Sequence, residues 1–185
     1  MAQSKQFNHE RNPENTKDEW LTPPPILQAL GPFDLDPCAP VNRPWNMAKN
    51  HYTIADDGLL RPWFGRKWVN PPYGAKAEPF MQRLAREGNG IALLFARTET
   101  QLFFDYVWAY ATSLLFLEGR LIFFNVDGTP ATDKDGKPSP AGAPSVLIGY
   151  GPENDEALRC SNLKGIYIPR RDWLRLPESR QYSFF

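Results

Sequence analysis

The alternation of apolar runs and polar stretches divides this chain into short strands and helices. An unbroken apolar run over 91–96 is typical of a strand buried on both faces. Other apolar stretches predict further strands over 33–36, 67–69, 113–117, 121–126 and 145–150. Residues 127–143 are rich in Gly, Pro, Asp and Lys, which predicts a long mobile loop.

Apolar residues at helical spacing predict helices over 76–88 and 99–110. A shorter helix is expected after Thr22, which resembles an N-cap with Pro23 in the first turn. The remaining expectations are a short strand with a helical turn over 163–175 and mostly irregular chain over 38–65.

Strands that alternate with helices, and then follow one another directly, predict an α/β fold. Its sheet is expected to be mainly parallel with an antiparallel end. At 185 residues the chain is expected to form a single domain over 18–185. Residues 1–17 are polar and lack periodicity, so a disordered N-terminal segment is predicted there.

The composition is that of a soluble globular protein, with 42% hydrophobic and 23% charged residues. Cys38 and Cys160 follow a start without a signal-peptide pattern, so we expect a cytoplasmic protein of a bacterial or phage-infected cell, without a disulfide. No apolar run approaches the ~20 residues that a membrane span needs. Cysteine and histidine are too few and too scattered to predict a zinc site, and no metal is expected.

The net charge is zero, but the charges are unevenly distributed. Residues 43–97 carry nine Lys and Arg against four Asp and Glu, whereas the first 42 residues carry three against six. Phosphate binding depends on the local patch rather than the total, so nucleic acid stays a possible partner. Solvated surface charge explains the same distribution equally well.

The most informative motif is Asn70-Pro71-Pro72-Tyr73, which follows the apolar pair Trp68-Val69 and precedes Gly74. Neither proline can donate a ladder hydrogen bond, so the strand must end there with rigid oxygen acceptors at its carboxyl end. Ligands of open α/β sheets bind at that end. Acceptors beside an aromatic ring suit a planar molecule that carries an NH2 group. The alternative is that the prolines merely end a strand.

Three other segments add candidate ligand-binding groups. Asp36-Pro37-Cys38-Ala39 places a carboxylate at the end of an early strand, where it either holds an amine-bearing cofactor or caps a turn. Asp57-Gly58-Leu59 adds a second acid and a tight turn, which is commonly no more than a turn. Glu19-Trp20-Leu21-Thr22-Pro23 either covers a ligand or packs its tryptophan on the core.

These motifs, in this order, resemble the phage-type DNA N6-adenine methyltransferase family. The resemblance spans residues 18 to about 150. It begins with Asp18-Glu19-Trp20, continues with Phe33-Asp34-Leu35-Asp36-Pro37-Cys38-Ala39 and includes the Asn70–Tyr73 motif. It extends through 95–100, 119–123 and 143–145. Several motifs in one order are more specific than any of them alone.

The resemblance implies a reduced Rossmann-like domain that transfers a methyl group from S-adenosylmethionine to the N6 amine of adenine in DNA. It implies that Asn70, Pro71, Pro72 and Tyr73 are catalytic and hold a flipped-out base. The implied cofactor-binding residues are Trp20, Thr22, Pro23, Asp36, Pro37, Cys38, Ala39 and Asp57. One departure is that the Gly-rich cofactor loop of broader methyltransferases is absent.

The candidate DNA-binding residues are Arg97, Arg120 and Lys76. The two arginines lie at strand boundaries, where they contact either DNA or a surface acid. Asn-Pro-Pro-Tyr also suits methylation of a glutamine amide in protein or of adenine in RNA, and an inactive DNA-binding relative is a third possibility. A monomer or weak dimer is expected.

Overall fold

The computed structural model describes residues 19–173 and contains one mixed sheet with the strand order β2-β1-β3-β4-β6-β5-β7. The predicted segment 1–17 lies outside the described residues. The strands, in chain order, are β1 (Leu35–Asp36), β2 (Asn50–His51), β3 (Lys67–Val69), β4 (Gly90–Phe95), β5 (Ser113–Leu117), β6 (Ser145–Tyr150) and β7 (Gly165–Pro169).

The prediction of a mainly parallel sheet is wrong, because the sheet has as many antiparallel as parallel strand pairings. The pairings β2–β1, β1–β3 and β3–β4 are parallel, and the pairings β4–β6, β6–β5 and β5–β7 are antiparallel. The antiparallel half also has the longer ladders. Prolines shorten the parallel half, because Pro37 and Pro71 come just after β1 and β3 and cannot donate ladder hydrogen bonds.

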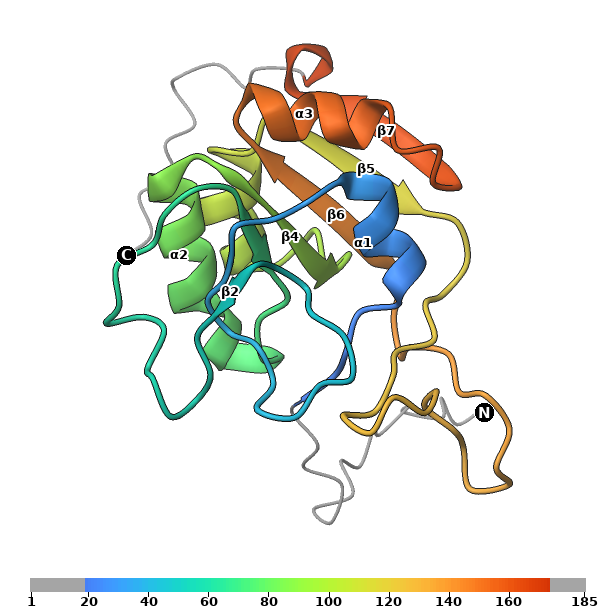
Figure 1. Cartoon of the computed structure of the whole chain (residues 1–185). Helices are drawn as coiled ribbons and strands as arrows, with labels where there is room; N and C mark the ends of the chain where they lie inside the picture. The colour runs from blue at the N-terminus through green and yellow to red at the C-terminus, as the bar shows by residue number, and fades with distance from the viewer. Residues whose placement is uncertain (1–18, 174–185) are drawn as a thin grey trace, which may run out of the picture.

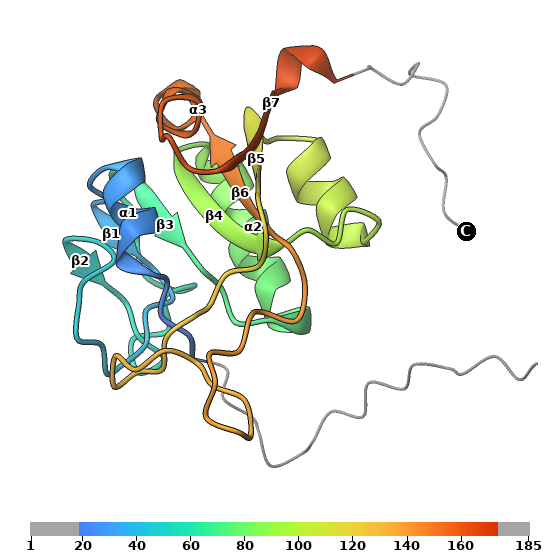
Figure 2. The same cartoon turned by 90° about the vertical axis from the view of Figure 1, so that its right-hand side faces the viewer.

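Helices cover both faces of this sheet (Figure 1). Figure 2 shows α1 (Pro24–Leu30) and α3 (Pro152–Arg159) on one side, and α2 (Ala77–Glu87) with the π-helix η2 (Phe103–Trp108) on the other. The 3₁₀ turns η1 (Gly74–Lys76) and η3 (Arg170–Asp172) complete the elements. The architecture is therefore a three-layer α/β/α arrangement.

Alternation along the central strands divides the core into two clusters. On β4, Ile91 and Leu93 pack toward α1 and α3, whereas Ala92 and Leu94 pack toward α2 and η2. Side chains of successive strand residues point to opposite faces, so a strand covered on both sides is apolar throughout. The unbroken apolar pattern of this segment follows from that double burial.

Most predicted elements are present, with some corrections. The strands over 67–69, 113–117 and 145–150 have the predicted bounds. The strand predicted over 121–126 is wrong: only Phe124 forms isolated bridges there, because β6 and β7 already occupy both edges of β5. The Thr22 N-cap is also wrong, since Pro23 holds the cap position and Thr22 makes no side-chain capping bond.

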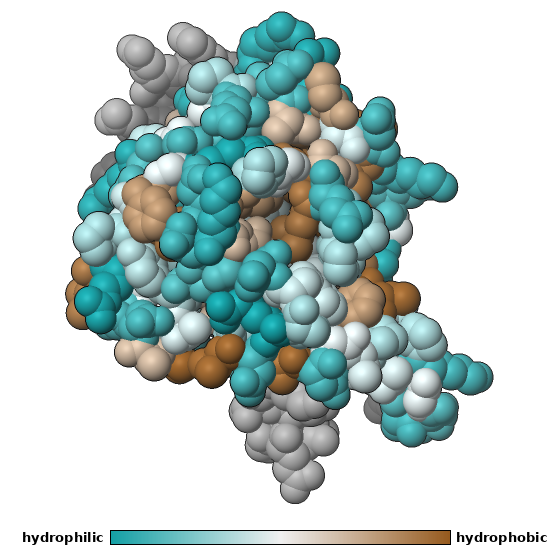
Figure 3. All heavy atoms as spheres, in the orientation of Figure 1, coloured by the Kyte–Doolittle hydropathy of each residue, from teal (hydrophilic) through white to brown (hydrophobic). Residues whose placement is uncertain are grey.

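Two elements were not predicted at all, β2 and α3. The mobility predicted for 127–143 stays a prediction, although isolated bridges join Phe124 to Pro130 and Thr132 to Pro138. Among residues 19–173, no helix is both long and apolar enough to cross a membrane. The face seen in Figure 3 is largely hydrophilic, with its apolar groups in small separate areas.

Candidate active site

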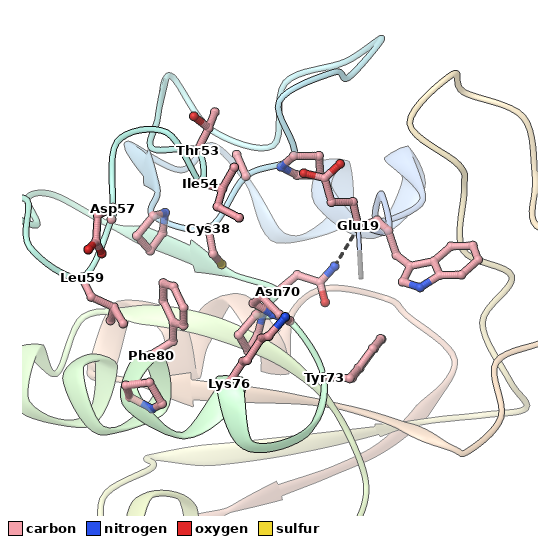
Figure 4. Close-up of a pocket in the computed structure, with 18 residues that line it drawn as sticks. Glu19, Cys38, Thr53, Ile54, Asp57, Leu59, Asn70, Tyr73, Lys76 and Phe80 are labelled. Carbon is pink, nitrogen blue, oxygen red and sulfur yellow. Dashed lines mark hydrogen bonds between the residues drawn. The ribbon is translucent and has the colours of Figure 1, made fainter. Parts of the chain in front are cut away.

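A cavity of about 470 Å³ lies at the carboxyl ends of β1 and β3 (Figure 4). Its size is in the range of small-molecule and cofactor sites. Four segments supply its walls: the N-terminal segment before α1, the turn after β1, the loop after β2, and the chain from the end of β3 into α2. The lining residues are Glu19, Trp20, Pro37, Cys38, Ala39, Pro40, Thr53, Ile54, Asp57, Gly58, Leu59, Asn70, Pro71, Pro72, Tyr73, Lys76, Pro79 and Phe80.

The Asn70–Tyr73 turn is rigid because of its sequence. Two prolines fix the backbone directly after β3, and Tyr73 is extended with φ −70° and ψ 160°. Gly74 then takes φ +80°, a left-handed conformation that reverses the chain into η1 and α2. The turn therefore presents its side chains from a fixed position at the cavity.

Asn70 has one satisfied and one unsatisfied side-chain group. Its Nδ2 donates to the Trp20 backbone oxygen at 3.1 Å, shown by the dashed line in Figure 4. Its Oδ1 is inaccessible to water and has no hydrogen-bond partner among the described residues. A buried acceptor without a partner costs about 1–3 kcal/mol, so it is a group that a ligand donor would satisfy.

The Tyr73 ring is already stacked on one face. Phe95 lies parallel to it, with ring centroids 4.3 Å apart and planes 4° apart, and Phe123 approaches edge-on at 6.4 Å. The Tyr73 hydroxyl is buried without a partner, and this burial raises its pKa. Tyr73 lines the cavity, and Phe95 does not.

Asp36 shapes the turn after β1 rather than the cavity surface. The side chain is buried, and its Oδ1 accepts a hydrogen bond from the Cys38 backbone N–H at 3.0 Å. Burial raises the pKa of Asp36 to about 7, against the lowering effects of the Cys38 hydrogen bonds and of Arg43. Pro37, Cys38 and Ala39 line the cavity in front of it. Burial also raises the pKa of the Cys38 thiol.

The loop after β2 closes the other side of the cavity. Thr53 donates from its backbone N–H and its hydroxyl to the Asp56 carboxylate, at 2.8 and 2.9 Å. Asp57 takes φ +52°, and Gly58 lies so close to Pro37 that any Cβ would overlap the Pro37 carbonyl oxygen. The glycine therefore brings Asp57 next to the turn after β1.

The sequence-predicted residues divide into those that meet at the cavity and those that do not. The whole Asn70–Tyr73 motif, Trp20, Pro37, Cys38, Ala39, Asp57 and Lys76 line it. Thr22, Pro23, Asp36, Arg97 and Arg120 do not. Arg120 lies elsewhere on the surface, where it donates to the Ala141 carbonyl at 3.5 Å. The roles of all these residues stay predictions.

Sequence reasoning missed part of the wall. Thr53 and Ile54 fall in the segment 38–65, for which irregular chain is expected, and Phe80 falls among the apolar residues of the helix predicted over 76–88. Nothing in the sequence pattern indicates that Thr53 and Ile54 line a cavity. Phe80 lies in the first turn of α2, directly after a motif that ends a strand, and this position was an available signal.

The wall chemistry suits a ligand with an aromatic ring system and positive charge. Phe80, Leu59 and the prolines give apolar surface, while Glu19 and Asp57 supply carboxylates and Lys76 an ammonium group. Among residues 19–173 there is no group of three or more His, Cys, Asp or Glu that could hold a metal ion.

An α/β sheet with a ligand-sized cavity at the carboxyl ends of its parallel strands defines a broad class of proteins that bind small ligands at that edge. Within this class, residues 9–144 match the model of the DNA N-6-adenine-methyltransferase (Dam) family. This match covers more than half of the chain, and the protein belongs to that family. Comparisons with curated proteins and with solved structures gave no match.

Proposed function

We propose that this protein transfers the methyl group of S-adenosylmethionine to the N6 amine of adenine in DNA. Family membership supports adenine methylation of DNA in general. The observation that carries the specific proposal is the Asn70 Oδ1, a buried acceptor without a partner at the wall of a cavity of about 470 Å³. An exocyclic amine is a donor that satisfies such an oxygen.

The residues of the cavity fit S-adenosylmethionine. Phe80, Leu59 and Pro37 would hold the adenine ring by apolar contact, and the carboxylates of Asp57 and Glu19 would hold the hydroxyl and ammonium groups. When bound, the cofactor supplies an electrophilic methyl group on a sulfonium. The protein contributes alignment, since it fixes both partners before reaction.

Asn70 and Pro71 would act on the target amine. The N6 nitrogen of adenine is a poor nucleophile because its lone pair is delocalised into the ring. When the Asn70 Oδ1 and the Pro71 carbonyl accept its two hydrogens, the lone pair is directed away from the ring. The same fixed oxygens stabilise the positive charge that grows on nitrogen, which is preorganised electrostatic stabilisation. An amide is no base, so the proton leaves to water.

The adenine must leave the DNA stack before it reaches this turn. Tyr73 would then stack on the base with the ring area that Phe95 leaves uncovered, which restores ~1–3 kcal/mol of lost stacking. Because the Asn70 Oδ1 is inaccessible to water in the free protein, base entry also requires a local displacement of the side chains around it.

Incubation with methyl-labelled S-adenosylmethionine and adenine-containing DNA, followed by digestion to nucleosides, tests this function. We expect label in N6-methyl-2′-deoxyadenosine from DNA. Asn70→Ala should lower the rate about 10²–10³-fold, by analogy with the loss of one oxyanion-hole donor, while cofactor-induced thermal stabilisation persists. The matched control is Asn42→Ala, an exposed position whose φ is not positive. Label in protein or RNA instead, or a fully active Asn70→Ala, would contradict the proposal.

A further inference from the structure

We propose that the backbone carbonyl of Trp20 is a positioning group, which fixes the Asn70 side-chain amide in the one orientation that accepts from a substrate amine. This inference rests on the proposed function and adds to it a requirement for a hydrogen-bond donor at position 70. The group acts on the substrate only through Asn70.

The orientation follows from the chemistry of the two partners. A backbone carbonyl can only accept, so the Asn70 atom that faces it at 3.1 Å must be Nδ2. The Oδ1 is thereby turned to the other side of the amide group, and Figure 4 shows it pointing away from the dashed hydrogen bond. There it is buried and without a partner among the described residues.

The Trp20 carbonyl is itself held in place by its neighbours. The next residue, Leu21, exchanges two backbone hydrogen bonds with Phe124, at 2.9 and 3.1 Å. The Trp45 indole N–H donates to the Thr22 carbonyl at 3.1 Å, and Trp20 packs its ring against the core. Each bond restricts rotation of the segment, so the carbonyl has little freedom to turn from Asn70.

An aspartate at position 70 distinguishes this role from simple acceptance. An ionised carboxylate supplies acceptors but no donor, and it would place a negatively charged oxygen against the Trp20 oxygen. A protonated carboxyl group reproduces the amide, because its O–H donates to Trp20 and its carbonyl oxygen stays free to accept. Asn70→Asp should therefore gain activity, relative to the native protein, as the pH falls.

Other charged groups face position 70 from the neighbouring elements. Glu19 precedes Trp20, Asp57 lies on the loop after β2, and Lys76 ends η1, just before α2. Cys38 and, behind it, Asp36 lie on the turn after β1. All of these groups are present in both the native protein and Asn70→Asp. Dividing the activity of Asn70→Asp by that of the native protein at each pH therefore removes the effect that their titration has on both proteins.

The test is the turnover of Asn70→Asp and native protein on the same DNA, at saturating cofactor, from about pH 5.5 to pH 8.5. We expect a deficit of about 10²–10³-fold at the alkaline end that shrinks by at least about tenfold at the acid end. The ratio for Asn70→Ala should stay constant with pH, and Asn162→Asp, which adds the same charge at an exposed site, should match the native protein throughout. Thermal unfolding at each pH identifies any loss caused by instability.

A pH-independent ratio for Asn70→Asp, or one that rises with pH, overturns the proposal while leaving adenine methylation by the native protein intact. Failure of the native protein to methylate adenine overturns the proposed function instead. If Asn70→Asp does not fold, hydrogen exchange of the Asn side-chain NH2 groups in the native protein decides the matter. The Asn70 resonance, identified by its absence in Asn70→Ala, should exchange more slowly than that of exposed Asn162, and equal rates would refute the role of Trp20.

Discussion

Asp36 ends β1 and Asn70 directly follows the neighbouring parallel strand β3, yet their environments are opposite in character. Asp36 accepts from the backbone of its own turn and lies behind the cavity wall. Asn70 leaves one acceptor unused at the wall itself. Both residues end a strand before proline, so the sequence alone could not tell which of them shapes a turn and which faces a ligand.

Tyr73 offers a test of what its ring and its hydroxyl contribute. The hydroxyl is buried without a partner, so Tyr73→Phe should leave methylation nearly unchanged and stability equal or higher by about 1 kcal/mol. Tyr73→Ala removes the surface on which the base would stack and exposes Phe95, so activity should fall by an order of magnitude or more. Steady-state kinetics and thermal unfolding measure both effects. Equal losses in the two variants would assign the role to the hydroxyl.

Asp36 should make the stability of the free protein depend on pH. The folded protein keeps this carboxyl group protonated up to about pH 7, whereas the unfolded chain releases the proton near pH 4. The resulting contribution of Asp36 to the free energy of unfolding is therefore fully present below about pH 4 and is lost as the pH rises through about 7. This contribution is on the order of 4 kcal/mol.

Asp36→Asn keeps the acceptor for Cys38 and cannot ionise, so this decline should disappear. Urea unfolding of both proteins at several pH values between about 4 and 8 gives the comparison. His51, whose pKa burial lowers to about 4, titrates with the opposite sign in both proteins, so the difference between them isolates Asp36. Parallel stability curves would show that Asp36 is ionised in the folded protein at neutral pH.

At the scale of elements, the cavity depends on a close contact between two turns. Gly58 lies against the Pro37 carbonyl, and the Trp63 indole N–H donates to the Gly58 carbonyl at 2.8 Å. A methyl group at position 58 must push these turns apart, because the atom in its way is backbone. The loop that carries Asp57 would then move away from the turn after β1.

Gly58→Ala should therefore weaken S-adenosylmethionine binding by at least about tenfold and lower stability by about 1–3 kcal/mol. Isothermal titration and thermal unfolding measure these effects. Gly142→Ala is the matched control, since no atom lies within 4 Å of an added Cβ there and no positive φ is recorded. Native affinity in Gly58→Ala would show that the cofactor does not depend on this contact.

The elements that sequence reasoning found and missed follow a physical rule. The segments 91–96 and 145–150 lie in the middle of the sheet, where double burial produces apolar runs that are easily recognised. The two-residue β2 at the edge is too short to show a pattern. The segment 121–126 is apolar because it packs beside α1 and Tyr73 rather than in a ladder, and periodicity does not separate these cases.

At the scale of the whole molecule, the cavity and the segment 118–144 lie at the same end of the sheet. The carboxyl ends of β3 and β4 point there, and β6 starts from there because it is antiparallel to β4. Figure 1 shows the segment, in yellow and orange, extending below the sheet. Its tip turns between the bridged residues Thr132 and Pro138, with Lys134 and Lys137 exposed.

Under the proposed function, we expect this tip to contact DNA beside the adenine that enters the cavity. Each lysine that neutralises a phosphate releases counterions, so the double change Lys134→Ala with Lys137→Ala should weaken DNA binding and reduce the slope of log K against log salt by about 2. Fluorescence anisotropy over a salt series measures both quantities. Arg86→Ala removes an exposed charge from the last turn of α2, at the opposite end of the sheet, and should leave the slope unchanged. An unaltered slope in the double variant, with S-adenosylmethionine binding intact, would show that the DNA does not contact this tip. The DNA would then approach the Asn70–Tyr73 turn from the other side of the cavity.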